Sequence, residues 1–178
     1  MIKYVAFLRG VNIGGNNKVE MVRLKKSFES LEFSNVSTYL NSGNVIFSDT
    51  SKNVKNITDK IEKEILKEFK LEIRVMVRDI KNIEKILDNI PVSWISELGM
   101  RPHVAFLWAD IDYPDILKLV GVNLKVDQVK YVPGAILWNV ELKYWSKDTV
   151  YKFTNGKLSK QITVRSINTV RKLNELMK

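Results

Sequence analysis

The apolar residues in the first part of the chain form first a continuous run and then a helical repeat. The segment Lys3–Arg9 is rich in Val, Phe and Tyr and ends at a glycine, which predicts a strand buried on both faces. Apolar residues then recur at helical spacing, so we expect a helix that begins at Val19 or Glu20 and ends by Phe33.

The pattern then predicts a hairpin, a second helix and a further strand. Val36–Asn41 and Asn44–Ser48 read as strands around Ser42-Gly43, a dipeptide suited to a tight turn because glycine accepts positive φ. Apolar residues at helical spacing mark Ile57–Phe69, and Ile73–Val77 alternates as a strand. The resulting order, strand-helix-strand-strand-helix-strand, is the ferredoxin-like arrangement.

The second half of the chain repeats this pattern in weaker form. His103–Trp108 matches Tyr4–Arg9 in character, and Tyr131–Trp138 resembles Tyr39–Phe47, each a strand, a tight turn and a strand. Helices are expected at Pro114–Val120, Lys147–Thr154 and Ser166–Met177. We therefore predict a degenerate duplication, in which helix replaces the last strand of the second copy.

The predicted fold is α+β, with two ferredoxin-like subdomains, the second degenerate with a helical C-terminus. The first subdomain is expected at residues 1–79 and the second at 103–178, with basic C-terminal helices. A linking helix from Ile80 to Asn89 and a segment with Pro, Ser and Gly fill residues 80–102.

Composition narrows the class of protein. With 178 residues, 45% of them hydrophobic, the chain can build a real core. It has no cysteine, which excludes a disulfide framework and a zinc site built on thiolates, and we expect no metal and no cofactor. No apolar run approaches the roughly 20 residues that span a bilayer, and Met1–Val5 lacks the layout of a signal peptide. A cytoplasmic protein without a membrane partner is expected; no oligomeric state is predicted.

The formal net charge of +9 is concentrated near the C-terminus. Lys143–Lys178 contains nine basic and two acidic residues, a net +7. Arg165, Asn168 (or Thr169) and Lys172 recur there at helical spacing, and such a polar stripe is suited to salt-dependent contacts with phosphates. An ordinary solvated face of an amphipathic helix is the simpler interpretation.

The loop Gly10–Lys18 is the strongest candidate for a site. Its backbone N–H groups could surround an anion next to the positive end of the following helix. The candidate anion-binding residues are Arg9, Asn12, Gly14, Gly15, Asn16, Asn17 and Lys18. The loop is not a nucleotide-hydrolase phosphate loop, because Asn16-Asn17 stand where Lys and Ser or Thr are required. Glycines and asparagines that merely permit left-handed turns are the alternative interpretation.

Asn41 is a low-ranking catalytic candidate beside this loop. In this topology the first and third strands are central, so the turn that holds Asn41 is expected near the loop. The layout looks like acylphosphatases, which cradle phosphate in such a loop and orient a water with an asparagine. Their motif is not matched, because their arginine closes the cradle where this chain has Lys18.

Other chemistry finds little support. His103 is the only histidine and no nucleophile motif accompanies it, so a catalytic triad is not expected. Asp110, Asp112 and Asp115 lack the pattern of a calcium loop and are expected to cap the helix at Pro114.

The third predicted strand does not favour an RNA-binding sheet. Asn44–Phe47 lacks the aromatic-rich signature on which RNA-recognition motifs stack bases. If Val45 and Phe47 face the helices, the open face receives Tyr4 and Leu8 together with Asn44 and Ile46.

Three segments resemble one family: Tyr4–Val19, Thr38–Phe47 and Thr163–Leu173. Together they are similar to the bacterial family of uncharacterised proteins known as domain of unknown function 1697. The chain departs from that family at Ser166 and Ile167, where asparagine and tryptophan are typical. The resemblance implies ferredoxin-like subdomains and no particular reaction.

The function expected from the sequence is non-enzymatic binding of a phosphate-bearing ligand, nucleic acid or nucleotide, through Gly10–Lys18. An acylphosphatase-like hydrolase and a protein-interaction or regulatory module remain open alternatives.

Overall fold

The computed structural model describes residues 1–94, 99–120, 127–141, 143 and 156–178. These residues form two compact units, the first of Met1–Ile83 with Lys172–Lys178 and the second of Glu84–Arg171. The predicted helix at Lys147–Thr154 lies outside the described residues. Within the described residues, no helix combines the length and the apolar character needed to cross a lipid bilayer.

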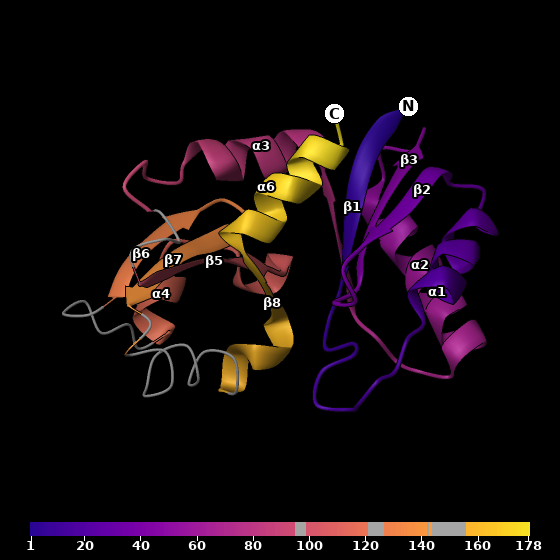
Figure 1. Ribbon diagram of the computed structural model, residues 1–178, viewed down its shortest axis with the longest axis horizontal. Coiled ribbons are helices and arrows are strands. Elements are labelled where there is room, and N and C mark those ends of the chain that lie inside the picture. Colours follow the sequence, from indigo (N-terminus) through magenta and orange to yellow (C-terminus); the bar gives the residue numbers. More distant parts are fainter. Residues whose placement is uncertain (95–98, 121–126, 142, 144–155) are drawn as a thin grey trace. The chain divides into compact units, whose positions relative to one another are not determined.

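Unit 1 contains one four-stranded antiparallel sheet in the order β2-β3-β1-β4. Its elements are β1 (Ile2–Leu8), α1 (Met21–Glu29), β2 (Ser34–Tyr39), β3 (Asn44–Asp49), α2 (Val54–Phe69), β4 (Val75–Asp79) and the start of α3 (Ile80–Asp88). Helices α1 and α2 cover one face of the sheet (Figure 1). The predicted ferredoxin-like order of the first half is confirmed.

Helix α2 shows how the sequence specifies these elements. Asn53 caps its N-terminus, because the Asn53 side chain accepts a hydrogen bond from the Asn56 N–H at 3.0 Å. Ile57, Ile61 and Ile65, spaced at four residues, are fully buried on one stripe. They pack with residues of the sheet in the core cluster of unit 1.

The register of β1 corrects one prediction about the sheet faces. Tyr4 pairs with Phe47 and Ala6 with Val45, so these four side chains share a face. Tyr4 and Leu8 therefore belong to the core cluster under the helices. The expectation that they lie on the opposite face is wrong, because antiparallel pairing places directly opposed residues on the same side.

Unit 2 contains a second antiparallel sheet with the equivalent order, β6-β7-β5-β8. Its elements are the rest of α3, β5 (Met100–Leu107), η1 (Ala109–Ile111), α4 (Ile116–Leu119), β6 (Asp127–Val132), β7 (Ala135–Glu141), η3 (Lys157–Gln161), β8 (Ile162–Ser166) and the start of α6 (Ile167–Leu176). The described fold is α+β with two ferredoxin-like sheets and a C-terminal helix, as predicted.

The second copy is less degenerate than the sequence indicated. We expected helix in place of its last strand, yet Ile162–Ser166 forms β8 and pairs with β5. The β-branched run Ile162-Thr163-Val164 favours extended backbone, and the helix begins only at Ile167. The predicted C-terminal helix is confirmed over Ile167–Leu176.

The strand-to-helix junctions also repeat between the copies. Val77–Ile80 and Val164–Ile167 share the pattern Val-Arg-x-Ile. Their arginines occupy equivalent places, opposite Val5 in β1 and Val104 in β5. The residue after each arginine, an aspartate or a serine, accepts a hydrogen bond from the N–H three residues further on, at 2.7 and 3.2 Å. This repeat strengthens the case for an internal duplication.

Candidate functional site

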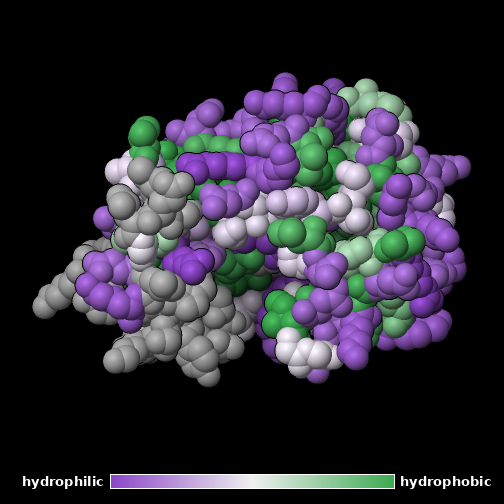
Figure 2. Space-filling model, in the orientation of Figure 1, coloured by the Kyte–Doolittle hydropathy of each residue, from purple (hydrophilic) through white to green (hydrophobic). Residues whose placement is uncertain are grey.

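The loop after β1 folds as a miniature hairpin. The Asn16 N–H donates to the Ile13 carbonyl at 3.1 Å, and both intervening glycines have positive φ, +58° at Gly14 and +81° at Gly15. Two successive positive φ values are the mark of a type I′ turn, which disfavours residues with a Cβ. Ile13 is 65% exposed, and Figure 2 shows hydrophobic surface at the place that this loop occupies in Figure 1.

The asparagine side chains hold the base of the loop together. The Asn17 Nδ2 donates to the Gly10 carbonyl at 3.1 Å, and the Asn12 N–H donates to the Asn17 carbonyl at 3.1 Å. Both asparagines have positive φ, +55° at Asn12 and +46° at Asn17, a conformation that asparagine tolerates well.

Asn12 makes the most extensive contacts in the loop. Its Nδ2 donates to the Val19 carbonyl at 2.9 Å and to the Asn41 carbonyl at 2.8 Å, while its Oδ1 accepts from the Val19 N–H at 2.9 Å. Asn12 therefore joins the two ends of the loop and ties them to the β2–β3 turn. The structure places Asn41 beside the loop, through its main-chain oxygen rather than its side chain.

The turn between β2 and β3 packs closely against the start of the loop. The Leu8 N–H donates to the Gly43 carbonyl at 2.8 Å. A Cβ at Gly43 would lie 2.5 Å from Cγ2 of Val11 and 2.7 Å from Cβ of Leu8, and φ there is +71°. Only glycine fits at this position, so the glycine of the turn fixes the distance between hairpin and loop.

These hydrogen bonds change the predicted anion cradle. The N–H groups of Asn12, Asn16 and Val19 are engaged within the loop. The loop is therefore not an open row of free amides, because the Asn16 N–H that the predicted anion cradle would use donates to the Ile13 carbonyl. Gly14 and Gly15 lie at an exposed tip.

An open pocket of about 580 Å³ lies where the loop enters α1. Its lining residues are Asn12, Lys18, Val19, Glu20, Met21, Arg23, Asn41 and Phe69. It therefore joins Asn12, Lys18 and Asn41 from the predicted set, whereas Arg9 and Gly14–Asn17 do not line it.

The N-terminus of α1 opens on this pocket without a side-chain cap. Glu20 occupies the N-cap position and, among the described residues, makes no capping hydrogen bond with its side chain. The first intrahelical bond of α1 runs from the Leu24 N–H to the Glu20 carbonyl at 2.9 Å. The N–H groups of Met21–Arg23 precede it and have no partner within the helix, so the positive end of α1 is available to a ligand.

Arg23 is the second cation that lines the pocket, and residues of α2 hold its guanidinium in place. Its guanidinium donates to the main-chain and side-chain oxygens of Glu68, the latter at 3.3 Å. The guanidinium also lies 4.9 Å from the ring centroid of Phe69. Arg23 is thus positioned by α2, whereas in the described part of the chain no contact holds the ammonium of the exposed Lys18 elsewhere.

Arg9 and the C-terminal candidates are not among the residues that line this pocket. Arg9 is half-buried directly after β1, and its N–H donates to the Arg74 carbonyl at 3.0 Å. Asn168 is exposed on α6, and the Lys172 ammonium lies 2.8 Å from a Glu175 carboxylate oxygen.

Arg165 corrects the predicted polar stripe. It belongs to strand β8 rather than to α6, so it does not continue the helical spacing of Asn168 and Lys172. Its guanidinium folds back onto Oγ1 of Thr163 at 3.0 Å and the Val164 carbonyl at 2.9 Å. Burial lowers the pKa of Arg165 to about 10.

The remaining titratable candidates have structural partners. Asp112 was expected to cap the helix at Pro114, but its Oδ1 accepts from the Tyr131 hydroxyl at 3.0 Å and the Gly134 N–H at 2.8 Å. It therefore ties the β6–β7 turn, as Asn12 ties the β2–β3 turn. His103 Nδ1 lies 2.8 Å from the Arg101 carbonyl. Among the described residues, no three or more His, Cys, Asp or Glu side chains are grouped so that they could hold a metal ion.

Sequence reasoning missed Glu20, Met21, Arg23 and Phe69. The absence of Ser, Thr, Asp or Asn immediately before α1 was a usable signal, because those residues normally occupy an N-cap. Phe69 and Arg23 could not be found this way, because helix packing brings the end of α2 next to the start of α1.

Comparisons with known proteins agree with this description. The structure of the conserved bacterial protein SP0830 from Streptococcus pneumoniae has a TM-score of 0.84 at 24% sequence identity, covers 99% of each chain, and has the same fold. The small subunit of acetolactate synthase from Thermotoga maritima has a TM-score of 0.25 at 16% identity, over 93% of this chain and 97% of that one, too low for any argument. No curated protein matches the chain. The family described as "Protein of unknown function (DUF1697)" matches residues 1–137, and the chain belongs to that family.

Proposed function

We propose that this protein binds a small phosphate-bearing molecule in the pocket at the start of α1. One observation carries the proposal: the uncapped first turn of α1 opens on a pocket beside the exposed ammonium of Lys18. Free N–H groups at a helix N-terminus and a nearby cation are the two features that favour phosphate there.

The lining of the pocket favours an organic phosphate over the inorganic ion. Met21 and Phe69 supply apolar surface beside the polar groups of Asn12, Lys18 and Asn41. The volume of about 580 Å³ lies within the roughly 300–1,000 Å³ typical of small-molecule sites. The phosphate would lie at the helix end, with the organic part of the ligand towards Phe69.

The same geometry gives nucleic acid less support. Nucleic acid would need basic surface beyond the loop, and the C-terminal stripe that could supply it lacks Arg165, because the Arg165 guanidinium folds onto β8. Lys172 also lies next to a carboxylate of Glu175. We therefore make binding of an oligonucleotide an outcome of the test.

Hydrolysis also has little support. The contact between Asn12 and Asn41 uses the main-chain oxygen of Asn41 and accounts for the position of the turn. Binding requires no group to activate a water, so we propose a binding protein.

The proposal is tested by calorimetric titration at low and moderate salt. The probes are ATP, inorganic phosphate and a generic single-stranded oligonucleotide. We compare the unmodified chain with Lys18→Ala and with Lys26→Ala, an exposed lysine of α1 that does not line the pocket. Loss of one exposed cation near the phosphate should weaken ATP binding about two- to fivefold, the equivalent of roughly 0.4–1 kcal/mol.

Three results would overturn the proposal. The first is no ATP binding at low salt, and the second is equal weakening by Lys18→Ala and Lys26→Ala. The third is tight binding of the oligonucleotide with none of ATP, which would favour nucleic acid.

A further inference from the structure

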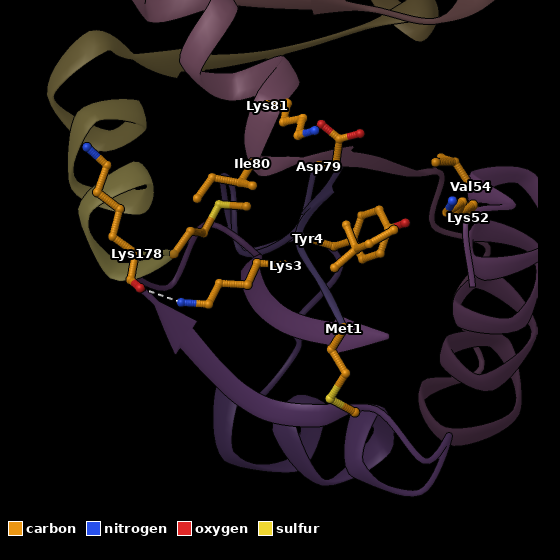
Figure 3. Close-up of a pocket in the computed structure, with 11 residues that line it drawn as sticks. Met1, Lys3, Tyr4, Lys52, Val54, Asp79, Ile80, Lys81 and Lys178 are labelled. Atoms are coloured by element: carbon orange, nitrogen blue, oxygen red, sulfur yellow. Dashed lines mark hydrogen bonds between the residues drawn. The ribbon is translucent and has the colours of Figure 1, made fainter. Parts of the chain in front are cut away.

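A second and larger pocket of about 760 Å³ lies around the first residues of β1 (Figure 3). All of its lining residues belong to unit 1: Met1, Ile2, Lys3, Tyr4, Lys52, Val54, Asp79, Ile80, Lys81, Met177 and Lys178. None of them lines the pocket at α1. The two pockets are therefore independent.

Basic side chains dominate the polar part of this second pocket. Lys3 comes from β1, Lys52 from the segment before α2 and Lys81 from the first turn of α3, and Figure 3 shows them around one space. The Lys3 ammonium donates to the main-chain oxygen of Lys178 at 2.5 Å. Lys52 and Lys81 are exposed. Three ammonium groups from separate segments create a local excess of positive charge.

The one acidic side chain among the described lining residues already has a partner. Asp79 accepts a hydrogen bond from the Asn82 N–H at 2.7 Å and so caps α3. A carboxylate held at the start of a helix compensates the N–H groups there and only part of the lysine charge. The pocket therefore favours an anion.

The rest of the lining is largely apolar. Ile2, Val54 and Ile80 are partly buried aliphatic residues, and Met1 and Met177 add two thioethers. Methionine side chains adapt to the shape of an apolar ligand because they are unbranched and polarizable.

The Tyr4 ring forms a firm wall of the pocket. The Tyr4 hydroxyl donates to the Ser51 carbonyl at 2.7 Å, and the ring stacks on Phe47 with centroids 5.6 Å apart. Burial, with smaller contributions from Asp79 and Asp49, raises the pKa of Tyr4, so the phenol stays neutral at physiological pH. Tyr4 therefore adds no negative charge against an anionic guest.

We propose that this second pocket binds an amphiphilic anion, an aliphatic chain that ends in a carboxylate or a phosphate. The lysines receive the anionic head, and the aliphatic and thioether side chains surround the chain. A polar anion would leave the apolar lining unused, and a neutral lipid would offer no anionic group to the exposed Lys52 and Lys81. The observations thus select a ligand with both parts.

The test uses decanoate and decyl phosphate below their micelle concentrations, with decanol and decyltrimethylammonium as uncharged and cationic comparisons. We compare the unmodified chain, the double variant Lys52→Glu/Lys81→Glu, and the matched control Lys26→Glu/Lys60→Glu, which changes net charge equally outside the pocket. The expected result is that both anions bind more tightly than decanol. Reversal of two nearby charges should weaken them about tenfold, and the control should not.

Methionine methyl NMR locates the ligand. The expected result is that decanoate shifts the methyl signals of Met1 and Met177 but not that of Met21, which lines the pocket at α1. Equal binding of decanol, equal weakening by both double variants, or shifts at Met21 alone would each overturn the inference. A difference between the two heads would identify carboxylate or phosphate as the preferred one. Because ATP binding is tested by Lys18→Ala and decanoate binding by Lys52→Glu/Lys81→Glu, failure here and failure at α1 are distinguishable.

Discussion

Replacing Gly43 by alanine is expected to destabilise unit 1 more than any other single glycine replacement in the loop region. Two costs combine at this position. An L-residue at φ +71° costs about 1–2 kcal/mol, and the new Cβ would also meet Cγ2 of Val11 at 2.5 Å and Cβ of Leu8 at 2.7 Å. Overpacking in a buried site costs about 1–3 kcal/mol. The expected loss of unfolding free energy is therefore about 2–5 kcal/mol.

Gly14→Ala is the matched control. Its φ is +58° but no atom lies within 4 Å of the added Cβ, so only the backbone cost applies. Urea unfolding followed by circular dichroism gives both changes. With a slope of about 2 kcal/mol/M, the midpoint of Gly43→Ala should lie roughly 0.5–1.5 M below that of Gly14→Ala. Equal midpoints would refute the close packing of hairpin against loop.

Three further predictions concern the site and unit 2. Asn12→Ala should lower the unfolding free energy by about 1–3 kcal/mol in the same urea assay, because it removes three hydrogen bonds; an unchanged midpoint would contradict the role of Asn12 as the tie between loop and turn. Glu20→Gln should strengthen ATP binding about twofold in calorimetry, because a carboxylate at the helix end repels phosphate; weaker binding would place the phosphate elsewhere. Burial holds the pKa of His103 below its usual 6.5, so the unfolded chain takes up the proton first. The unfolding free energy should therefore be highest above pH 6.5 and fall as the pH drops towards the folded-state pKa of His103. His103→Gln should flatten this pH dependence. An NMR titration that gives His103 a pKa of 6.5 or higher would contradict the prediction.

The order of the elements could be predicted because it depends on local spacing. Isoleucines every four residues mark α2, and the alternation at Ile73–Val77 marks the region of β4. The predictions that proved wrong depend on contacts between parts of the chain that are distant in sequence, or on the exact point where one element ends. The face on which Tyr4 lies depends on its register with Phe47, and a strand buried on both faces carries no alternation from which to read it. Arg165 was assigned to a helix because β8 is short and runs directly into α6.

Only part of the candidate site could be predicted from the sequence. The loop, including Lys18, and the neighbouring Asn41 could be singled out from the glycine and asparagine content and the expected topology. The side-chain bonds of Asn12 could not, since they require the folded positions of Val19 and the turn. The proposed site therefore lies at the start of α1, where Glu20 makes no capping hydrogen bond with its side chain, rather than along the loop.

The most direct test of the account is an amide NMR titration of the unmodified chain with ATP at low salt. The account predicts the largest shifts at the N–H groups of Lys18 and Met21–Arg23, and their loss in Lys18→Ala. Shifts confined to Gly14 and Gly15 or to α6, or shifts at α1 that survive Lys18→Ala unchanged, would contradict the claim that phosphate binds at the start of α1.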